Sequence, residues 1–282
     1  MGGAQHVMAM VFSALTNPGD TVLTGELTYS GMKSLANFLH IRLRGLAMDE
    51  EGIRADALEA ACATTDAKAL YCMPTLQNPT AVVMSERRRQ EIAAIAESYG
   101  LAVVEDDSYG FLLPEVKPLG AYVTTKKNFY YLTGTSKSLA PGLRIGYLLS
   151  PAEMVDRLAA AISATTFIAS PVTAEIVTAW LENGTADQVM DWKRGEVRNR
   201  QKLARTWRSR RLGSRERGAY GGLRARSSRR TLLRDGRSRR KDSRGDGERR
   251  SYPIDRRGRT AHRTRAHGAR VALRSHGGRD TG

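Results

Sequence analysis

Apolar residues recur along the first 165 positions at the spacings of alternating helices and strands. A helix is expected almost from the first residue, because four apolar side chains share one helical face: Val7, Val11, Ala14 and Leu15. The turn-forming sequence 17–20 then ends this helix. The next expected elements alternate in type: strand 21–23, helix 29–39, strand 41–48 and helix 55–63. This alternation is typical of α/β domains.

Two nearly continuous apolar runs, 68–73 and 101–104, predict strands that are covered on both faces. The segment between them has helical spacing, and it closes with a glycine: Ile92, Ile95, Ala96, Tyr99 and Gly100. This order is a βαβ unit. Further strands are expected at 130–132 and 145–149. The predicted fold class is therefore α/β, a three-layer α/β/α sandwich with a mostly parallel sheet, over residues 1–165.

A long capped helix is expected after the last strand. Ser150 has the character of an N-cap, Pro151 suits the first helical position, and Glu153 lies three residues after the cap. Residues 166–204 are interpreted as a helical connection toward a small domain that the chain lacks.

Composition separates the last part of the chain from the rest. Residues 205–282 contain 25 Arg and one Lys against five Asp and two Glu, a net charge of +19, so residues 1–204 carry −3. No apolar period is long enough there to bury a face, which predicts a disordered tail. One interpretation is a basic tail that binds nucleic acid. The excess of Arg over Lys and the few aromatic residues favour the other, a shifted reading frame.

Several classes of protein are disfavoured. Cys62 and Cys72 form no CxxC pair and have no histidine at ligand spacing, so neither a disulfide framework nor a zinc site is indicated. No apolar run approaches the roughly 18 residues that span a bilayer, and the N-terminus lacks the regions of a signal peptide. We expect no membrane association and a cytoplasmic location.

The most informative segment is 134–146, which places Lys137 after a strand and Arg144 seven residues later, across a Pro-Gly turn. A phosphate-binding P-loop is excluded, because no Gly-Lys-Ser/Thr follows a glycine at the required spacing. A surface Lys-Ser loop is the plain alternative. Two other loops follow apolar strands: 74–80 contains an Asn-Pro pair, and 105–109 is acidic. Parallel α/β sheets bind ligands at such strand ends.

These loops, in this chain order, resemble those of the class I and II aminotransferases that use pyridoxal phosphate (PLP), over roughly residues 2–200. The segments 5–6, 28–31 and 105–107 are most similar to the aminotransferase-like domain of GntR/MocR-type regulators and to the aminoadipate-type aminotransferases. The resemblance implies PLP as the cofactor and Lys137 as the catalytic lysine that forms a Schiff base with it. It also implies that the chain is truncated at its start and scrambled at its end.

The resemblance assigns the cofactor to further residues. Ala4 and Gln5 at the first helix, with Ser136 and Arg144, would hold the phosphate, as expected of a helix N-terminus. Asp106 would keep the pyridine nitrogen protonated. The ring contacts would come from Tyr29, which stacks on the ring, and from Asn78 and Tyr109, which donate to its 3′ oxygen. Gly134 departs from the family, since a hydroxyl residue is expected there.

Three functions remain open. The first is an aminotransferase that acts on an amino acid and a 2-oxo acid, as a homodimer, although inactive in this form. The second is a PLP- and effector-sensing domain of a transcriptional regulator, with DNA as a partner only through a winged-helix domain. The third is a nonfunctional remnant.

Overall fold

The computed structural model describes residues 1–211, with side chains up to residue 207. Most of the Arg-rich segment that is expected to be a tail, residues 212–282, lies outside the described residues. The described part is an α/β domain whose central sheet has six strands: β1 (Thr21–Gly25), β2 (Arg42–Leu46), β5 (Ala67–Cys72), β6 (Ala102–Asp106), β7 (Phe129–Gly134) and β8 (Gly146–Leu149).

The strand order is β2-β1-β5-β6-β7-β8. The first five strands are parallel, and only β8 runs antiparallel to β7. The expected mostly parallel sheet is therefore confirmed, as is the βαβ unit made by β5, α4 (Glu86–Ser98) and β6. As expected, α4 is followed by Gly100, which has a left-handed backbone conformation with φ of 62°.

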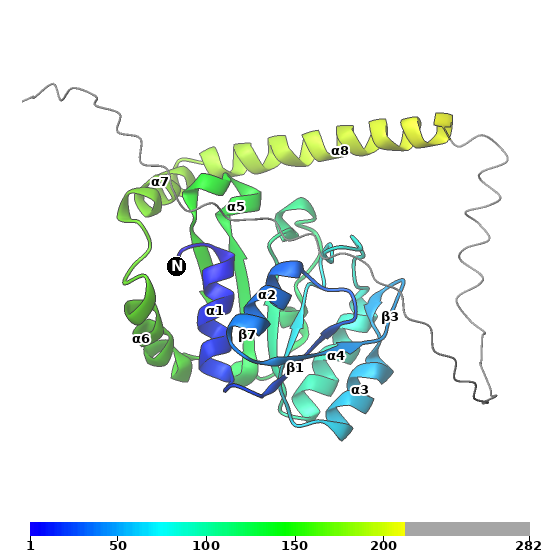
Figure 1. Cartoon of the computed structure of the whole chain (residues 1–282). Helices are drawn as coiled ribbons and strands as arrows, with labels where there is room; N and C mark the ends of the chain where they lie inside the picture. The colour runs from blue at the N-terminus through cyan, green and yellow to red at the C-terminus, as the bar shows by residue number, and fades with distance from the viewer. Residues whose placement is uncertain (212–282) are drawn as a thin grey trace, which may run out of the picture. The chain divides into compact units, whose positions relative to one another are not determined.

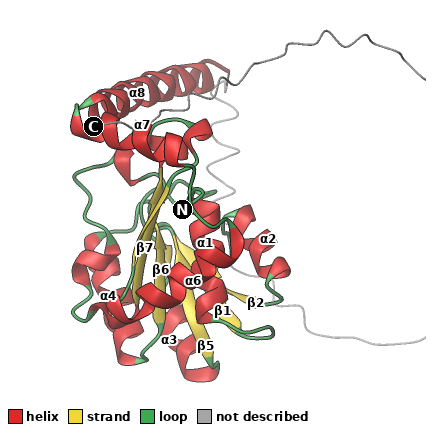
Figure 2. Cartoon of the chain, turned by 90° about the vertical axis from the view of Figure 1, so that its left-hand side faces the viewer, coloured by secondary structure: helices red, strands yellow, loops and turns green. Residues whose placement is uncertain are grey.

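Helices cover both faces of the sheet (Figures 1 and 2). Successive strand residues alternate between two apolar clusters. Val104 and Tyr71 pack with helices α1 (Ala4–Leu15), α2 (Ser30–Phe38) and α6 (Val155–Thr165). Val103 and Leu70 pack with α3 (Ala55–Thr64) and α4. This alternation confirms the three-layer α/β/α sandwich, because the central strands contribute side chains to both layers.

The helix after β8 begins later than its sequence suggests. A 3₁₀ turn, η5 (Ala152–Met154), precedes α6, and the amide of Met154 donates to the carbonyl of Pro151. The expected cap by Ser150 is therefore wrong: the tight turn forms first and moves the start of the α-helix away from the serine hydroxyl. No side-chain cap is formed at either element.

Two helices occupy the segment interpreted as a connection: α7 (Pro171–Glu182) and α8 (Thr185–Arg211). α8 extends seven residues into the segment that was expected to be a disordered tail, and that expectation is wrong for residues 205–211. Arg, Lys, Gln and Leu have high helix propensity, and Arg200 pairs with Glu196 one turn earlier. A helix can continue under these conditions although it buries little apolar surface.

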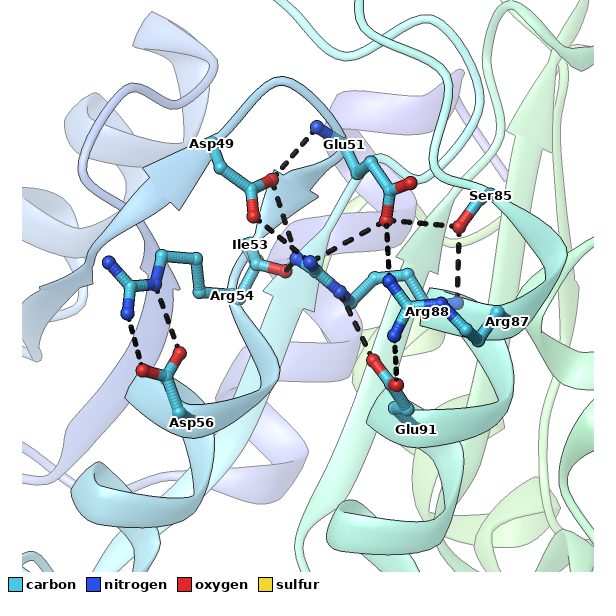
Figure 3. Close-up of polar contacts among 9 residues, drawn as sticks. All are labelled: Asp49, Glu51, Ile53, Arg54, Asp56, Ser85, Arg87, Arg88 and Glu91. Carbon is cyan, nitrogen blue, oxygen red and sulfur yellow. Dashed lines mark hydrogen bonds and ion pairs between the residues drawn. The ribbon is translucent and has the colours of Figure 1, made fainter.

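A small hairpin, β3 (Met48–Asp49) and β4 (Gly52–Ile53), is tied to the start of α4 by a charged cluster (Figure 3). The guanidinium of Arg88 donates to Asp49 Oδ2 at 2.9 Å and to the carbonyl of Ile53 at 2.8 Å. Ser85 caps α4 by accepting from the amide of Arg88 and donates to Glu51. The hairpin therefore has a fixed position beside the loop that follows β5.

Within residues 1–211, no helix combines the length and the apolar character needed to cross a membrane. The same part of the chain holds no cluster of His, Cys, Asp and Glu arranged for a metal ion. Cys62 and Cys72 are both free.

Candidate functional site

One cavity of about 180 Å³ lies at the carboxyl ends of the parallel strands, beside the N-terminus of α1. All nine residues that the sequence singles out line it, together with four others: Ala4, Gln5, Met8, Tyr29, Met73, Asn78, Asp106, Ser108, Tyr109, Gly134, Ser136, Lys137 and Arg144. The carboxyl end of a parallel sheet is where α/β proteins bind ligands. We call this cavity the candidate cofactor pocket.

The N-terminus of α1 forms one wall of the pocket. Gly3 adopts a left-handed conformation with φ of 88°, and its carbonyl accepts from the amides of His6 and Val7. The first amides of a helix have no intrahelical acceptor, so those of Ala4 and Gln5 are the ones suited to an anion. A side chain at Gly3 would meet the guanidinium of Arg144 at 3.1 Å. The turn is therefore compact only because glycine stands there.

Arg144 joins this turn to the segment that carries Lys137. Its Nη1 donates to the hydroxyl of Ser136 and its Nη2 to the carbonyl of Gly2, both at 3.3 Å. Arg144 itself has a left-handed backbone conformation, with φ of 51°, after the 3₁₀ turn η4 (Pro141–Leu143). A guanidinium, a hydroxyl and helix amides thus converge at one end of the pocket, a donor set that suits a phosphate group.

The departure from the family at Gly134 has a packing reason. A Cβ atom at this position would lie 3.1 Å from the carbonyl oxygen of Ile145 and 3.3 Å from the amide nitrogen of Ala4. The strand end and the start of α1 approach each other closely here. A residue with a side chain would require one of these backbone segments to shift by a few tenths of an ångström.

Asp106 presents a buried carboxylate to the pocket and is 3% exposed. Its Oδ2 accepts from the hydroxyl of Tyr71 at 2.9 Å, and its Oδ1 accepts from the hydroxyl of Ser108 at 2.6 Å and from that residue's amide at 3.1 Å. Burial raises the pKa of Asp106, while these hydrogen bonds oppose the rise. The site therefore holds a carboxylate of fixed orientation, and a cationic partner would stabilise its charged form.

The two neighbouring acids do not line the pocket. Asp107 accepts from the hydroxyl of Tyr131 at 2.7 Å, and Glu105 accepts from the amides of Leu119 and Gly120 at 2.9 and 3.0 Å. Successive residues along a strand point to opposite faces of the sheet, which explains why Asp106 differs from both neighbours.

Lys137 lies in the short helix α5 (Thr135–Ser138), directly after β7. Its Nζ is 5.8 Å from the centre of the Tyr109 ring. Lys137 and Tyr109 therefore lie close together in the pocket lining, although they follow two different strands.

Tyr29 and Asn78 complete the lining. A Cβ at Gly31 would overlap the ring of Tyr29, so the ring folds back over this glycine. The carbonyl of Gly31 accepts from Gln5 Nε2 at 3.2 Å. Beside Asn78, the side chain of Gln77 donates to the carbonyl of Leu27 at 2.7 Å and so ties the Asn-Pro loop to the loop that precedes Tyr29.

Sequence reasoning missed four features of this site. Met8 and Met73 line the pocket, and Tyr71 orients Asp106, but each appears in the sequence only as one apolar residue of a helix or strand. Ser108 could have been found, because an aspartate followed two residues later by serine is typical of a turn closed by the aspartate side chain.

The chain belongs to the class I and II aminotransferase family, whose sequence model matches residues 1–212. This confirms the resemblance drawn from the loops. The cofactor expected from it, pyridoxal phosphate, is confirmed at the level of the family.

The relatives are of two kinds. One is an uncharacterized HTH-type transcriptional regulator, YisV of Bacillus subtilis, which is 32% identical over 72% of this chain and 43% of its own length. Another is aromatic-amino-acid aminotransferase 1 of Thermococcus litoralis, which is 28% identical over 66% of this chain and 46% of its own length. The chain thus spans less than half the length of these curated relatives.

The chain is also similar to a solved aminotransferase structure. The kynurenine aminotransferase of Pyrococcus horikoshii, in complex with PMP and with kynurenine as substrate, is similar with a TM-score of 0.64 and 27% identity. The similarity covers 69% of this chain and 50% of that enzyme.

Proposed function

We propose that residues 1–211 form the cofactor-binding domain of a PLP-dependent aminotransferase, in which Lys137 is the point of covalent attachment. One observation carries the proposal: the amine of Lys137 and the buried carboxylate of Asp106 line the same cavity, together with a phosphate-type donor set. When bound, PLP supplies an aldehyde for attachment and a protonated ring that withdraws electrons from the substrate.

Each part of the pocket suits one part of that cofactor. Arg144, Ser136 and the amides of Ala4 and Gln5 would hold the phosphate. Asp106 would hold a proton on the ring nitrogen, since a buried carboxylate favours a cation beside it. Of the pocket's other polar groups, Asn78 and Tyr109 would donate to the 3′ oxygen, and Tyr29 would cover the ring.

Lys137 would have a second role in the reaction. Its free amine at Nζ would take the α-proton of a bound amino acid and return it to another atom. The contact with the Tyr109 ring keeps this amine inside the pocket. The proposed reaction transfers an amino group from an amino acid to a 2-oxo acid, and a homodimer is the proposed assembly.

A second function is favoured by a different observation. Three relatives that each match over 71–72% of this chain are HTH-type transcriptional regulators. In this alternative, the same pocket binds PLP and an amine effector, and a winged-helix domain joined to it binds DNA. Both functions need Lys137 and Asp106, and they differ in whether amino transfer follows.

Titration of the purified chain with PLP tests the shared part of the proposal. We expect a visible absorption band that borohydride bleaches, with the reduced cofactor on Lys137 by peptide mass spectrometry. Lys137→Ala should abolish the band, whereas Lys202→Ala, an exposed lysine of α8, should leave it unchanged. An unchanged band in Lys137→Ala would overturn the assignment.

Adding an amino acid and a 2-oxo acid then separates the two functions. Repeated turnover with formation of the new amino acid supports the aminotransferase. A single spectral change without turnover is expected of the sensing domain, and also of an aminotransferase that is inactive in this form.

A further inference from the structure

Helix α8 contacts two segments of the pocket, the one that contains Lys137 and the one that follows Tyr109. Lys193 Nζ donates to the backbone carbonyls of Lys137 and Leu139, at 2.9 and 2.5 Å. The next residue, Arg194, donates through Nη1 to the carbonyl of Phe111 at 2.7 Å. Phe111 lies in η1 (Gly110–Leu112), immediately after Tyr109. Figure 1 shows α8 beside α5, the short helix of Lys137.

The carbonyls that Lys193 contacts lie at the end of a very short helix. The last carbonyls of any helix lack intrahelical donors, and α5 has only four residues. A lysine ammonium at this end supplies the donors and a favourable charge. The carbonyl and the side chain of Lys137 are attached to the same Cα atom. The hydrogen bond from Lys193 to this carbonyl therefore restricts the direction in which the Lys137 side chain extends from the backbone.

Arg194 makes a matching contact with the segment that follows Tyr109. Its side chain is 19% exposed and is also paired with Asp191 of α8, one turn earlier. The pairing with Asp191 therefore holds the guanidinium of Arg194 in position to donate to η1. Burial lowers the pKa of the neighbouring Lys193, as expected for an ammonium that has left water for these carbonyls.

Apolar packing reinforces the contact of α8 with the lysine segment. A separate cluster joins the segment after α5 to α7 and α8, and its buried members are Leu139, Leu143, Ile145, Val177 and Ala186. Apolar side chains of the segment 139–145 thus pack against these two helices. Lys193 adds the polar contact at the point where that segment meets Lys137.

We propose that Lys193 and Arg194 are positioning residues of the cofactor pocket, which set the relative placement of Lys137 and Tyr109 through the backbone of the two segments. The inference rests on the proposed PLP site. Neither side chain lines the pocket itself. Their effect on the cofactor would be transmitted through the residues that they hold.

The test compares Lys193→Met with the unmodified chain and with two controls. Methionine keeps the length and helix propensity but removes the donors. We expect the Kd for PLP to rise roughly tenfold or more, as for the loss of charged hydrogen bonds. The visible circular dichroism of the bound cofactor should also change, because that signal reports the orientation of the ring. Lys193→Arg should restore both the Kd and the circular dichroism spectrum, and Lys202→Met on α8 should change neither.

Arg194→Met is an independent second variant, expected to alter the same circular dichroism signal through Tyr109. Thermal unfolding without PLP shows whether each variant is folded. If the unmodified chain binds no PLP, the proposed function itself fails. If it binds PLP and a folded Lys193→Met or Arg194→Met gives the same Kd and spectrum, the cofactor site stands and the positioning role is overturned. Failure of Lys193→Arg to restore binding would also count against the role.

Discussion

The hydroxyl of Tyr71 donates a 2.9 Å hydrogen bond to the carboxylate of Asp106, and both side chains are buried. Tyr71 comes from β5 and Asp106 from the end of β6, so two neighbouring strands fix the carboxylate that lines the pocket. Burial and the adjacent Asp106 raise the pKa of Tyr71 well above its ordinary value, so this hydroxyl is a donor at every physiological pH.

Tyr71→Phe should remove this donor while keeping the ring. We expect a loss of about 1–3 kcal/mol in the free energy of unfolding, because a buried carboxylate oxygen loses its partner. The Kd for PLP should rise as well, since Asp106 would be less well oriented. Urea unfolding and PLP titration measure the two effects. Tyr99→Phe, at an exposed tyrosine, is the matched control, and an equal effect there would remove the special role of Tyr71.

Asp106 and Asp107 should differ sharply as determinants of cofactor binding. Asp106→Asn is expected to weaken PLP binding roughly ten- to a hundredfold, because the ring nitrogen loses its charged partner. Asp107→Asn keeps the pocket lining and disturbs the contact with Tyr131, so it should mainly lower stability. Parallel titrations with PLP decide the matter. If Asp107→Asn weakened PLP binding more than Asp106→Asn, Asp107 rather than Asp106 would be the carboxylate that contacts the cofactor.

Arg144→Met should affect the phosphate and leave the ring contacts intact. We expect its Kd for PLP to rise roughly tenfold or more, while the affinity for pyridoxal, which lacks the phosphate, stays nearly the same. The ratio of the two affinities is the measurement. Arg157→Met, an exposed arginine of α6, should leave that ratio unchanged. Equal losses for both ligands would show that Arg144 acts on the shape of the pocket instead.

Glu105 should make stability depend on pH. Burial raises its pKa to about 7, although the amides of Leu119 and Gly120 oppose the rise. The unfolded value is about 4.3, so between these two pH values the folded chain holds a proton that the unfolded chain has lost. The free energy of unfolding should therefore fall as pH rises from about 4.5 to about 7.

Glu105→Gln cannot titrate, so its free energy of unfolding should change less over this pH range than that of the unmodified chain. Urea unfolding at several pH values gives both curves. The exposed Glu59→Gln should follow the unmodified chain. Parallel curves for all three proteins would contradict the raised pKa.

The sequence by itself determined the order of the elements and the location of the site. Alternating helix and strand periods predicted β1, β5, β6 and the helices between them, because burial on one or both faces leaves a local pattern. The three loops of Asn78, Asp106 and Lys137 follow apolar strands, and parallel strands end at the same edge of a sheet. Their convergence in one pocket was therefore predictable.

Only the tertiary structure decided which further side chains support that pocket. Tyr71 looks like any apolar strand residue, and Lys193 like any charged residue of a polar helix, until β5 lies beside β6 and α8 beside α5. The extent of α8 was also misjudged, because a helix that buries few residues has no apolar period to reveal it. Local periodicity records burial, whereas a hydrogen bond between residues 35 or 56 positions apart depends on packing that no short segment of sequence contains.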